Sequence, residues 1–280
     1  MAIAVGIILL VVITVLFHFL SPWWFTPIAA NWAEIDLTVD ITFWVTGIVF
    51  IILNAFLIWV IIKYRHRQGL KAHYEPESKK LEWWLTIITT VGVVAMLAPG
   101  LWVWARVVDV PDDAAIVEVV GQQWHWSYRF PGEDGVLGQV DISLIGEDNP
   151  FGIKPDDPAG RDDVLIANGE LHLPVGQPYK FLLRSRDVLH NFTVPQFRVK
   201  MDLVPGMVPY AWLEPTRTGR FDIMCEELCG IGHFAMRGAV VVEERTAFDD
   251  WLDSYPSFEE FLQRPAANVS VGQALYGVCS

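Results

Sequence analysis

The stretch Cys225-Glu226-Glu227-Leu228-Cys229-Gly230-Ile231-Gly232-His233-Phe234-Ala235-Met236 gathers two thiols, one imidazole, one thioether and two carboxylates in twelve residues. Sulfur ligands beside an imidazole suit copper, zinc or iron–sulfur chemistry. The two glycines between Cys229 and His233 allow the chain to turn tightly around a small ligand. We therefore expect a metal site in this stretch.

The spacing of these donors leaves several kinds of site open. A single zinc ion takes four nitrogen or sulfur ligands and rarely uses Met, and a blue-copper site needs only one Cys beside two His and a distant Met. Two copper ions bridged by both thiolates would use every donor if a second His came from elsewhere, and His190 in Asp187-Val188-Leu189-His190 is the best candidate. A disulfide between Cys225 and Cys229 is the alternative in an oxidising compartment.

Three apolar segments precede this region, at residues 2–20, 41–62 and 83–105, and each is long enough to span a bilayer. The first contains no Lys or Arg, unlike a secretory signal, so we expect a retained helix, with a processed signal as the alternative. The loop at 63–80 is basic and the loop at 21–40 carries no Lys or Arg. The positive-inside rule then places everything after Arg106 on the outer face of a bacterial inner membrane.

Residues 106–245 show short strand-like runs separated by Pro and Gly, which predicts an all-β, Greek-key sandwich. The runs are 116–120, 123–130, 179–183, 191–194 and 239–242. Residues 146–163 are interpreted as an acidic surface insertion, and residues 246–263 as an amphipathic helix packed on the sandwich. We expect four parts, at 1–40, 41–105, 106–245 and 246–280.

The net charge of −13 arises wholly after residue 105, where 27 acidic residues face 14 basic ones. Nucleic-acid binding requires a basic surface, so this balance argues against it. An acidic soluble domain attracts a basic protein partner and speeds their encounter.

The pattern C-x-E-x-C-x3-H-x2-M, preceded by D-V-L-H, resembles subunit II of the haem–copper cytochrome c oxidases, and the resemblance spans roughly residues 35–250. It implies a cupredoxin fold carrying the binuclear copper centre called CuA. The copper ligands implied are the side chains of His190, Cys225, Cys229, His233 and Met236 and the backbone carbonyl of Glu227. Many members of this family have only two membrane spans, so the first helix is a departure.

The resemblance also assigns roles outside the copper ligands. It implies that Trp124 receives electrons from cytochrome c, and we expect Trp124 to share one face of a strand with Trp126 and Tyr128. Asp187 matches a family residue that docks the donor. The remaining docking candidates are Asp134, Asp141 and Asp202.

Two glutamates carry implied roles at the contacts with other subunits. The side chain of Glu227 matches a carboxylate that binds magnesium next to the catalytic subunit, and carboxylates suit this ion. Glu82, at the cytoplasmic mouth of the third span, matches a residue at the start of the K proton path. By position alone it is an acid favoured at a helix N-terminus.

The activity implied is that of a respiratory cytochrome c oxidase subunit. Electrons pass from cytochrome c through CuA to haem in subunit I, where oxygen is reduced to water and protons are pumped, and subunit III is a further expected partner. The alternative is a copper electron-transfer domain of another reductase, such as a nitrous oxide reductase. A quinol oxidase subunit would lack the cysteines, and a copper chaperone would lack the aromatic stretch Trp124-His125-Trp126-Ser127-Tyr128.

The C-terminal residues Gly272–Ser280 resemble the opening of a cytochrome c domain, in which the first Cys of a C-x-x-C-H motif follows G-x-x-x-Y. The chain stops one residue after Cys279, so the motif is incomplete. We expect haem c only if a longer native chain exists.

Overall fold

The computed structural model describes residues 2–21, 26–69, 71, 76–146 and 149–263. The chain divides into two compact units, which are described separately. One contains the N-terminal helices as far as Ala105, and the other contains the segment Thr26–Ala33 together with the chain from Arg106 onward. The expected division into four parts remains a prediction, and the expected cytochrome c opening lies outside the described residues.

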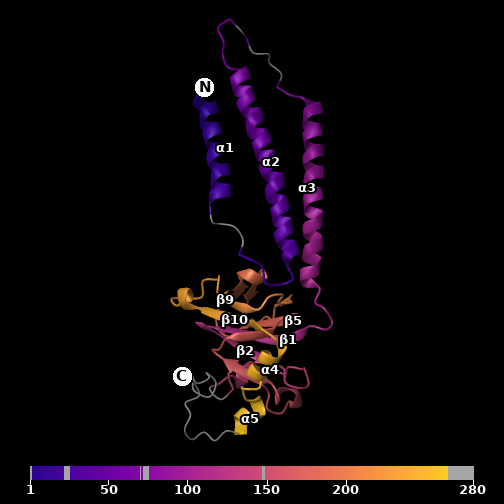
Figure 1. Cartoon of the computed structure of the whole chain (residues 1–280), viewed down its shortest axis with the longest axis vertical. Helices are drawn as coiled ribbons and strands as arrows, with labels where there is room; N and C mark the ends of the chain where they lie inside the picture. Colours follow the sequence, from indigo (N-terminus) through magenta and orange to yellow (C-terminus); the bar gives the residue numbers. More distant parts are fainter. Residues whose placement is uncertain (1, 22–25, 70, 72–75, 147–148, 264–280) are drawn as a thin grey trace. The chain divides into compact units, whose positions relative to one another are not determined.

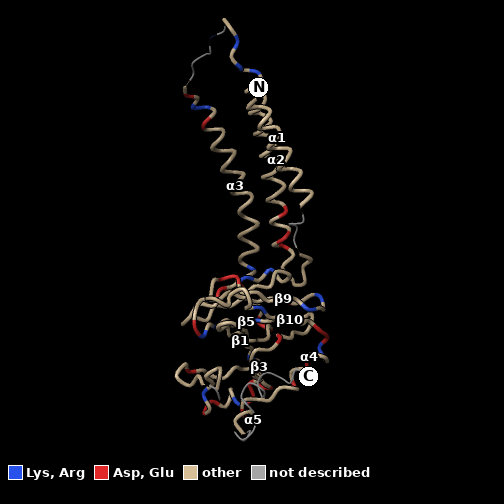
Figure 2. Tube along the Cα trace, turned by 90° about the vertical axis from the view of Figure 1, so that its left-hand side faces the viewer, with Lys and Arg blue, Asp and Glu red and all other residues tan. Residues whose placement is uncertain are grey.

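The first unit consists of three long helices, shown in Figure 1: α1 (Ala2–Leu20), α2 (Ala33–Lys63) and α3 (Lys79–Val108). All three are long and apolar enough to cross a membrane, which confirms the expected spans. The 31 residues of α2 extend about 46 Å at 1.5 Å per residue, well beyond a hydrocarbon core of roughly 30 Å. Both α2 and α3 extend past their apolar segments through polar residues, which suit the interfacial region of a membrane. Figure 2 shows the charged residues near the helix ends.

The second unit is a sandwich of two five-stranded sheets. The first sheet has the order β3 (Val164–Ala167), β2 (His125–Phe130), β1 (Ala115–Gln122), β5 (Tyr179–Ser185) and β8 (Tyr210–Leu213). The second has the order β4 (Leu171–Pro174), β10 (Arg237–Glu243), β9 (Gly219–Met224), β6 (His190–Val194) and β7 (Val199–Leu203). The pairs β1–β5 and β4–β10 are parallel and the others antiparallel, so the chain crosses between sheets. The predicted β-sandwich is confirmed.

Aromatic side chains from both sheets fill the interior of the sandwich. Phe181 of β5 and Phe192 of β6 are fully buried, and their ring centroids lie 5.9 Å apart across the two sheets. Trp126 of β2 meets Phe192 edge-to-face at 5.7 Å. Such aromatic pairs stabilise a core beyond the area that they bury.

The strand predicted over 123–130 begins two residues later than expected. Gln123 and Trp124 form the turn between β1 and β2, and Gln122 pairs with His125. Trp126 and Tyr128 lie in the core as expected, but Trp124 does not share their face and is 37% exposed. The reason is that the chain must reverse here to bring β2 back alongside β1.

The segment Thr26–Ala33, expected only as an outer loop, packs on the sandwich through β8. Trp32 Nε1 donates to Trp212 O at 3.1 Å, and the two indoles meet edge-on at 4.6 Å. Trp212 Nε1 in turn donates to Arg106 O, and Tyr210 Oη donates to Val108 O. Strand β8 therefore binds the segment Thr26–Ala33 and the backbone of Arg106 and Val108, all within the second unit.

The segment 146–163 is not a simple surface insertion. Among its described residues, Phe151 and Ile153 pack into a buried cluster with Leu165, and Asp163 is fully buried. Asp163 Oδ2 accepts from Arg129 Nη1 at 2.7 Å, and both side chains are buried. The acid therefore compensates the charge of a buried arginine. Two short 3-10 helices, η1 (Ile142–Leu144) and η2 (Pro158–Gly160), shape this region.

The single helix predicted over 246–263 is also corrected. It is two helices, α4 (Arg245–Leu252) and α5 (Phe258–Gln263). Pro256 between them disfavours helical geometry at the residue before it. Phe248 and Phe258 provide the buried contacts of the two helices.

We predict that Arg129→Met lowers the free energy of unfolding by about 3–5 kcal/mol, because it leaves Asp163 buried without its cation and removes one of the two arginines that pair with Glu118, the other being Arg184. Denaturant unfolding followed by tryptophan fluorescence measures this loss. The control is Arg220→Met, which breaks an exposed pair with Glu170 and should cost less than about 1 kcal/mol. Equal losses in the two variants would contradict the expectation.

Candidate metal centre

Three adjacent strands of the second sheet deliver the predicted ligands to one end of the sandwich. His190 is the first residue of β6, Cys225 directly follows β9, and Met236 directly precedes β10. Between Cys225 and Met236 the chain forms a loop that we call the metal loop, residues 225–236, with a turn of 3-10 helix η4 (His233–Ala235). The Cys225 amide donates to Met236 O at 3.3 Å, so the β9–β10 pairing closes the loop at its base.

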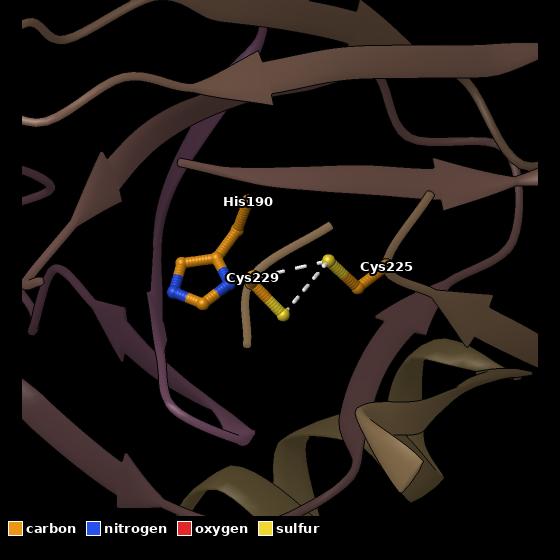
Figure 3. A group of neighbouring side chains, drawn as sticks. All are labelled: His190, Cys225 and Cys229. Atoms are coloured by element: carbon orange, nitrogen blue, oxygen red, sulfur yellow. Dashed lines mark hydrogen bonds between the residues drawn. The ribbon is translucent and has the colours of Figure 1, made fainter. Parts of the chain in front are cut away.

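The imidazole of His190 and the two thiols point toward one another (Figure 3). Their ligand atoms all lie within 4.8 Å of one another, and all three residues are buried. The two Sγ atoms are 3.8 Å apart, and Cys225 Sγ lies 3.9 Å from His190 Nδ1.

The separation of the thiols fits shared metal ligation. Both cysteines are free, and their Sγ atoms are 3.8 Å apart, whereas a disulfide bond is about 2.05 Å long. Metal–sulfur bonds of about 2.3 Å at a tetrahedral angle place two sulfurs roughly 3.8 Å apart. The structure thus presents two thiols rather than the alternative disulfide.

The remaining donors predicted from the sequence gather around the same thiols. His233 Nδ1 lies 3.5 Å and Met236 Sδ 3.8 Å from Cys229 Sγ, while Glu227 O lies 3.3 Å from Cys225 Sγ. Two imidazole nitrogens, a thioether and a carbonyl therefore gather around the two thiols, with His190 and Glu227 O beside Cys225 and with His233 and Met236 beside Cys229. Such a set of soft and borderline ligands suits copper or zinc and is a poor match for magnesium or calcium.

Asp187 orients His190 for this role. Its Oδ1 accepts from His190 Nε2 at 2.7 Å, which leaves Nδ1 as the ring nitrogen that faces the thiols. Partial burial acts to raise the pKa of Asp187, but bonds from the Gln123 amide, the His190 ring and the Val188 amide outweigh it and lower the pKa below its usual value. A carboxylate behind a ligating histidine fixes the tautomer and raises the basicity of the ligand.

The thiol of Cys229 is neutral before metal binds, because its pKa is raised. Burial, together with the neighbouring thiol of Cys225, raises the pKa of Cys229 to about 11. Near pH 7 a metal ion must therefore displace a proton from this thiol, as metal binding to cysteine generally requires.

Trp124 contacts the metal loop directly. Its Nε1 donates to Cys229 O at 3.3 Å, and a Cβ on Gly232 would lie 2.3 Å from the indole. The glycines of the loop therefore make room for the indole, besides allowing the tight turn expected from the sequence. Gln123, which the sequence did not single out, donates to the same carbonyl at 2.8 Å. No spacing signal pointed to it, because its partner lies 106 residues away.

The four predicted docking acids are not brought together. Asp187 lies at the metal centre, and Asp202 on β7 accepts from Asn191 Nδ2 at 2.6 Å, one residue from His190. Asp134 and Asp141 follow the far end of β2, roughly 20 Å from Trp124 at about 3.3 Å per residue. Of the four acids, Asp187 and Asp202 are therefore the two that lie close to the metal centre.

The two predicted glutamates differ in their surroundings. Glu227 places its carbonyl beside Cys225 and keeps a half-buried side chain, while its neighbour Glu226 pairs with Lys200 at 2.9 Å. Glu82 lies in the first turn of α3, in the helical unit, and its side chain is exposed.

Comparison with known proteins agrees with this geometry. A family model described as the periplasmic domain of cytochrome c oxidase subunit II matches residues 115–244. The chain is 55% identical over 258 residues to an alternative cytochrome c oxidase subunit 2 of Bradyrhizobium diazoefficiens, covering 92% of this chain and 93% of the relative. It is 31% identical over 227 residues to cytochrome c oxidase subunit 2 of Cereibacter sphaeroides, covering 75% and 74%.

A solved structure is also similar to part of the chain. The crystal structure of the periplasmic domain of subunit II of cytochrome oxidase of Bradyrhizobium japonicum shares 28% identity, with a TM-score of 0.39. It covers 55% of this chain and 99% of that one.

We predict that Asp187→Asn weakens metal binding by roughly 10–100-fold, because the amide no longer fixes the His190 tautomer. Copper affinity measured by competition with a chromogenic chelator tests this. Asp222→Asn, on an exposed position of β9, is the matched control and should leave the affinity unchanged. Unchanged affinity in Asp187→Asn would contradict the assignment.

Proposed function

The chain belongs to the family of cytochrome c oxidase subunit II, and on that premise we propose that its β domain accepts electrons from cytochrome c and delivers them to haem in the catalytic subunit. As a member of this family it is a subunit of a haem–copper oxidoreductase, with a periplasmic domain of the CuA type. The apolar helices and this domain together correspond to a protein of the bacterial inner membrane.

The proposed ligands of a copper pair are His190, Cys225, Cys229, His233 and Met236, with the carbonyl of Glu227. Their convergence within 3.9 Å of a thiol sulfur supports this set. When bound, the copper pair supplies one-electron redox chemistry spread over two ions and two sulfurs. The residues supply a buried, pre-shaped site: Cys229 and Met236 are 2% and 1% exposed, which keeps water from the centre.

The observation that carries the proposal is the hydrogen bond from Trp124 to Cys229 O. One end of this indole is exposed at the surface, and the other touches the backbone of a ligand. Trp124 thus offers a covalent and hydrogen-bonded connection from the surface to the metal centre, as expected for the residue that receives electrons.

The surface around Trp124 supports docking of a protein donor. Leu228, Ile231 and Phe234 of the metal loop are 80%, 88% and 82% exposed. Exposed apolar clusters of this kind mark interaction surfaces. Asp187 and Asp202 add negative charge beside them, which suits a basic cytochrome c, whereas Asp134 and Asp141 would act only at longer range.

The contacts with other subunits follow from the resemblance. We assign magnesium binding to the side chain of Glu227, and the start of the K proton path to Glu82. Subunits I and III, with proton pumping, complete the proposed assembly. A nitrous oxide reductase-like domain is not favoured, because the chain carries three apolar helices and is similar to oxidase subunits along most of its length. We propose haem c as a cofactor only if a longer native chain exists.

The wild-type chain should contain two copper ions and show a seven-line hyperfine pattern in electron paramagnetic resonance. This pattern arises because one unpaired electron is shared by two copper nuclei. Cys229→Ser removes one of the two thiols that would hold the copper ions and should abolish the seven-line pattern. A four-line spectrum from the wild type would indicate a mononuclear site, and zinc in place of copper would refute the proposal.

Trp124→Leu should keep both coppers but slow electron uptake from reduced cytochrome c by about tenfold, equivalent to about 1.4 kcal/mol in the barrier. Stopped-flow absorbance measures the rate. Ile142→Ala, which alters an exposed apolar residue of η1 outside the proposed docking surface, is the control and should leave the rate unchanged. A normal rate in Trp124→Leu with full copper content would exclude Trp124 as the receiving residue.

A further inference from the structure

We propose that Gln123 is a positioning residue that holds the two halves of the metal centre, the His190 half and the thiol half in the metal loop, in fixed relative positions. The ligands come from two places, His190 from the start of β6 and the others from the metal loop. Gln123 binds both places from the β1–β2 turn, and it is 64 residues from Asp187 and 106 residues from Cys229 along the chain. The inference rests on the copper centre proposed above.

The backbone of Gln123 acts on the histidine half. Its N–H donates to Asp187 Oδ2 at 2.7 Å, while Oδ1 of the same carboxylate accepts from His190 Nε2 at 2.7 Å. Both oxygens of Asp187 are thereby engaged. The carboxylate cannot rotate without losing one of these bonds, so the turn constrains the direction in which His190 Nδ1 points.

The side chain of Gln123 acts on the thiol half. Its Nε2 donates to Cys229 O at 2.8 Å, a shorter contact than the 3.3 Å from Trp124 Nε1 to the same oxygen. A carbonyl can accept two such bonds through its two lone pairs. Because the carbonyl and the side chain of Cys229 share one Cα, fixing the carbonyl limits the positions open to Sγ.

The metal loop is shaped to receive this side chain. Gly230 adopts φ +121°, and a Cβ placed there would lie 2.8 Å from Gln123 Nε2. A larger residue would therefore displace the amide from Cys229 O. Close packing of loop and turn at this point is what a positioning contact requires, since a loosely held ligand shell costs affinity.

The variant Gln123→Met tests the side-chain half, because methionine has a similar length but no N–H to donate, and the backbone bond to Asp187 is kept. In the full chain purified in detergent, we expect copper loss to a chelator to accelerate by about tenfold, as for other residues that orient ligands. The absorption bands and reduction potential of the copper-loaded centre should shift. In copper-free protein, hydrogen exchange should increase at the His233 and Ala235 amides, which donate to Gly230 O and Gly232 O within the metal loop.

The control is Gln122→Met at the neighbouring position, whose Oε1 accepts from Arg186 rather than from the metal loop. It should leave the rate of copper loss, the absorption bands, the reduction potential and the hydrogen exchange unchanged. If Gln123→Met matches the wild type in copper loss, spectrum and hydrogen exchange, the inference is overturned. If the wild type itself lacks two coppers, the proposed function fails instead, and the hydrogen-exchange comparison still decides whether Gln123 orders the loop.

Discussion

The structure depends on the backbone bond that closes the metal loop, from the Cys225 amide to Met236 O. This bond continues the antiparallel pairing of β9 with β10, in which Met224 faces Arg237. Ten intervening residues must then fold back within a short span, and the loop glycines allow it. His190 enters the same space because β6 is the next strand in the sheet, beside β9. Sheet order, rather than any single side chain, brings the six donors together.

The second constraint is the turn between β1 and β2, which belongs to the other sheet. Trp124 lies against Gly232 and Gln123 against Gly230, so the two sheets meet at the metal loop. The surface residue proposed to receive electrons is therefore built into the same packing that shapes the ligands. A change in the loop would alter the turn, and a change in the turn would alter the loop.

Much of this molecule could be predicted from its sequence, for physical reasons that differ by region. Apolar length identified the three helices, because a bilayer core sets a minimum span. The interval from Cys225 to Met236 identified the thiol half of the centre, because the ligands are local. His190 was predicted because a copper pair needs a second imidazole from outside the metal loop, and the resemblance implied the same residue. Gln123 was missed, because its bonds depend on sheet topology. Asp163 was taken for a surface acid because its partner Arg129 is 34 residues away.

The burial of the thiols bears on how the centre is assembled. Cys225 and Cys229 are 8% and 2% exposed, so the closed loop covers most of both residues. A protein that delivers metal ions by direct contact would meet more of the two sulfurs while the loop is open. The order of folding and metallation, besides affinity, therefore bears on how the centre is filled.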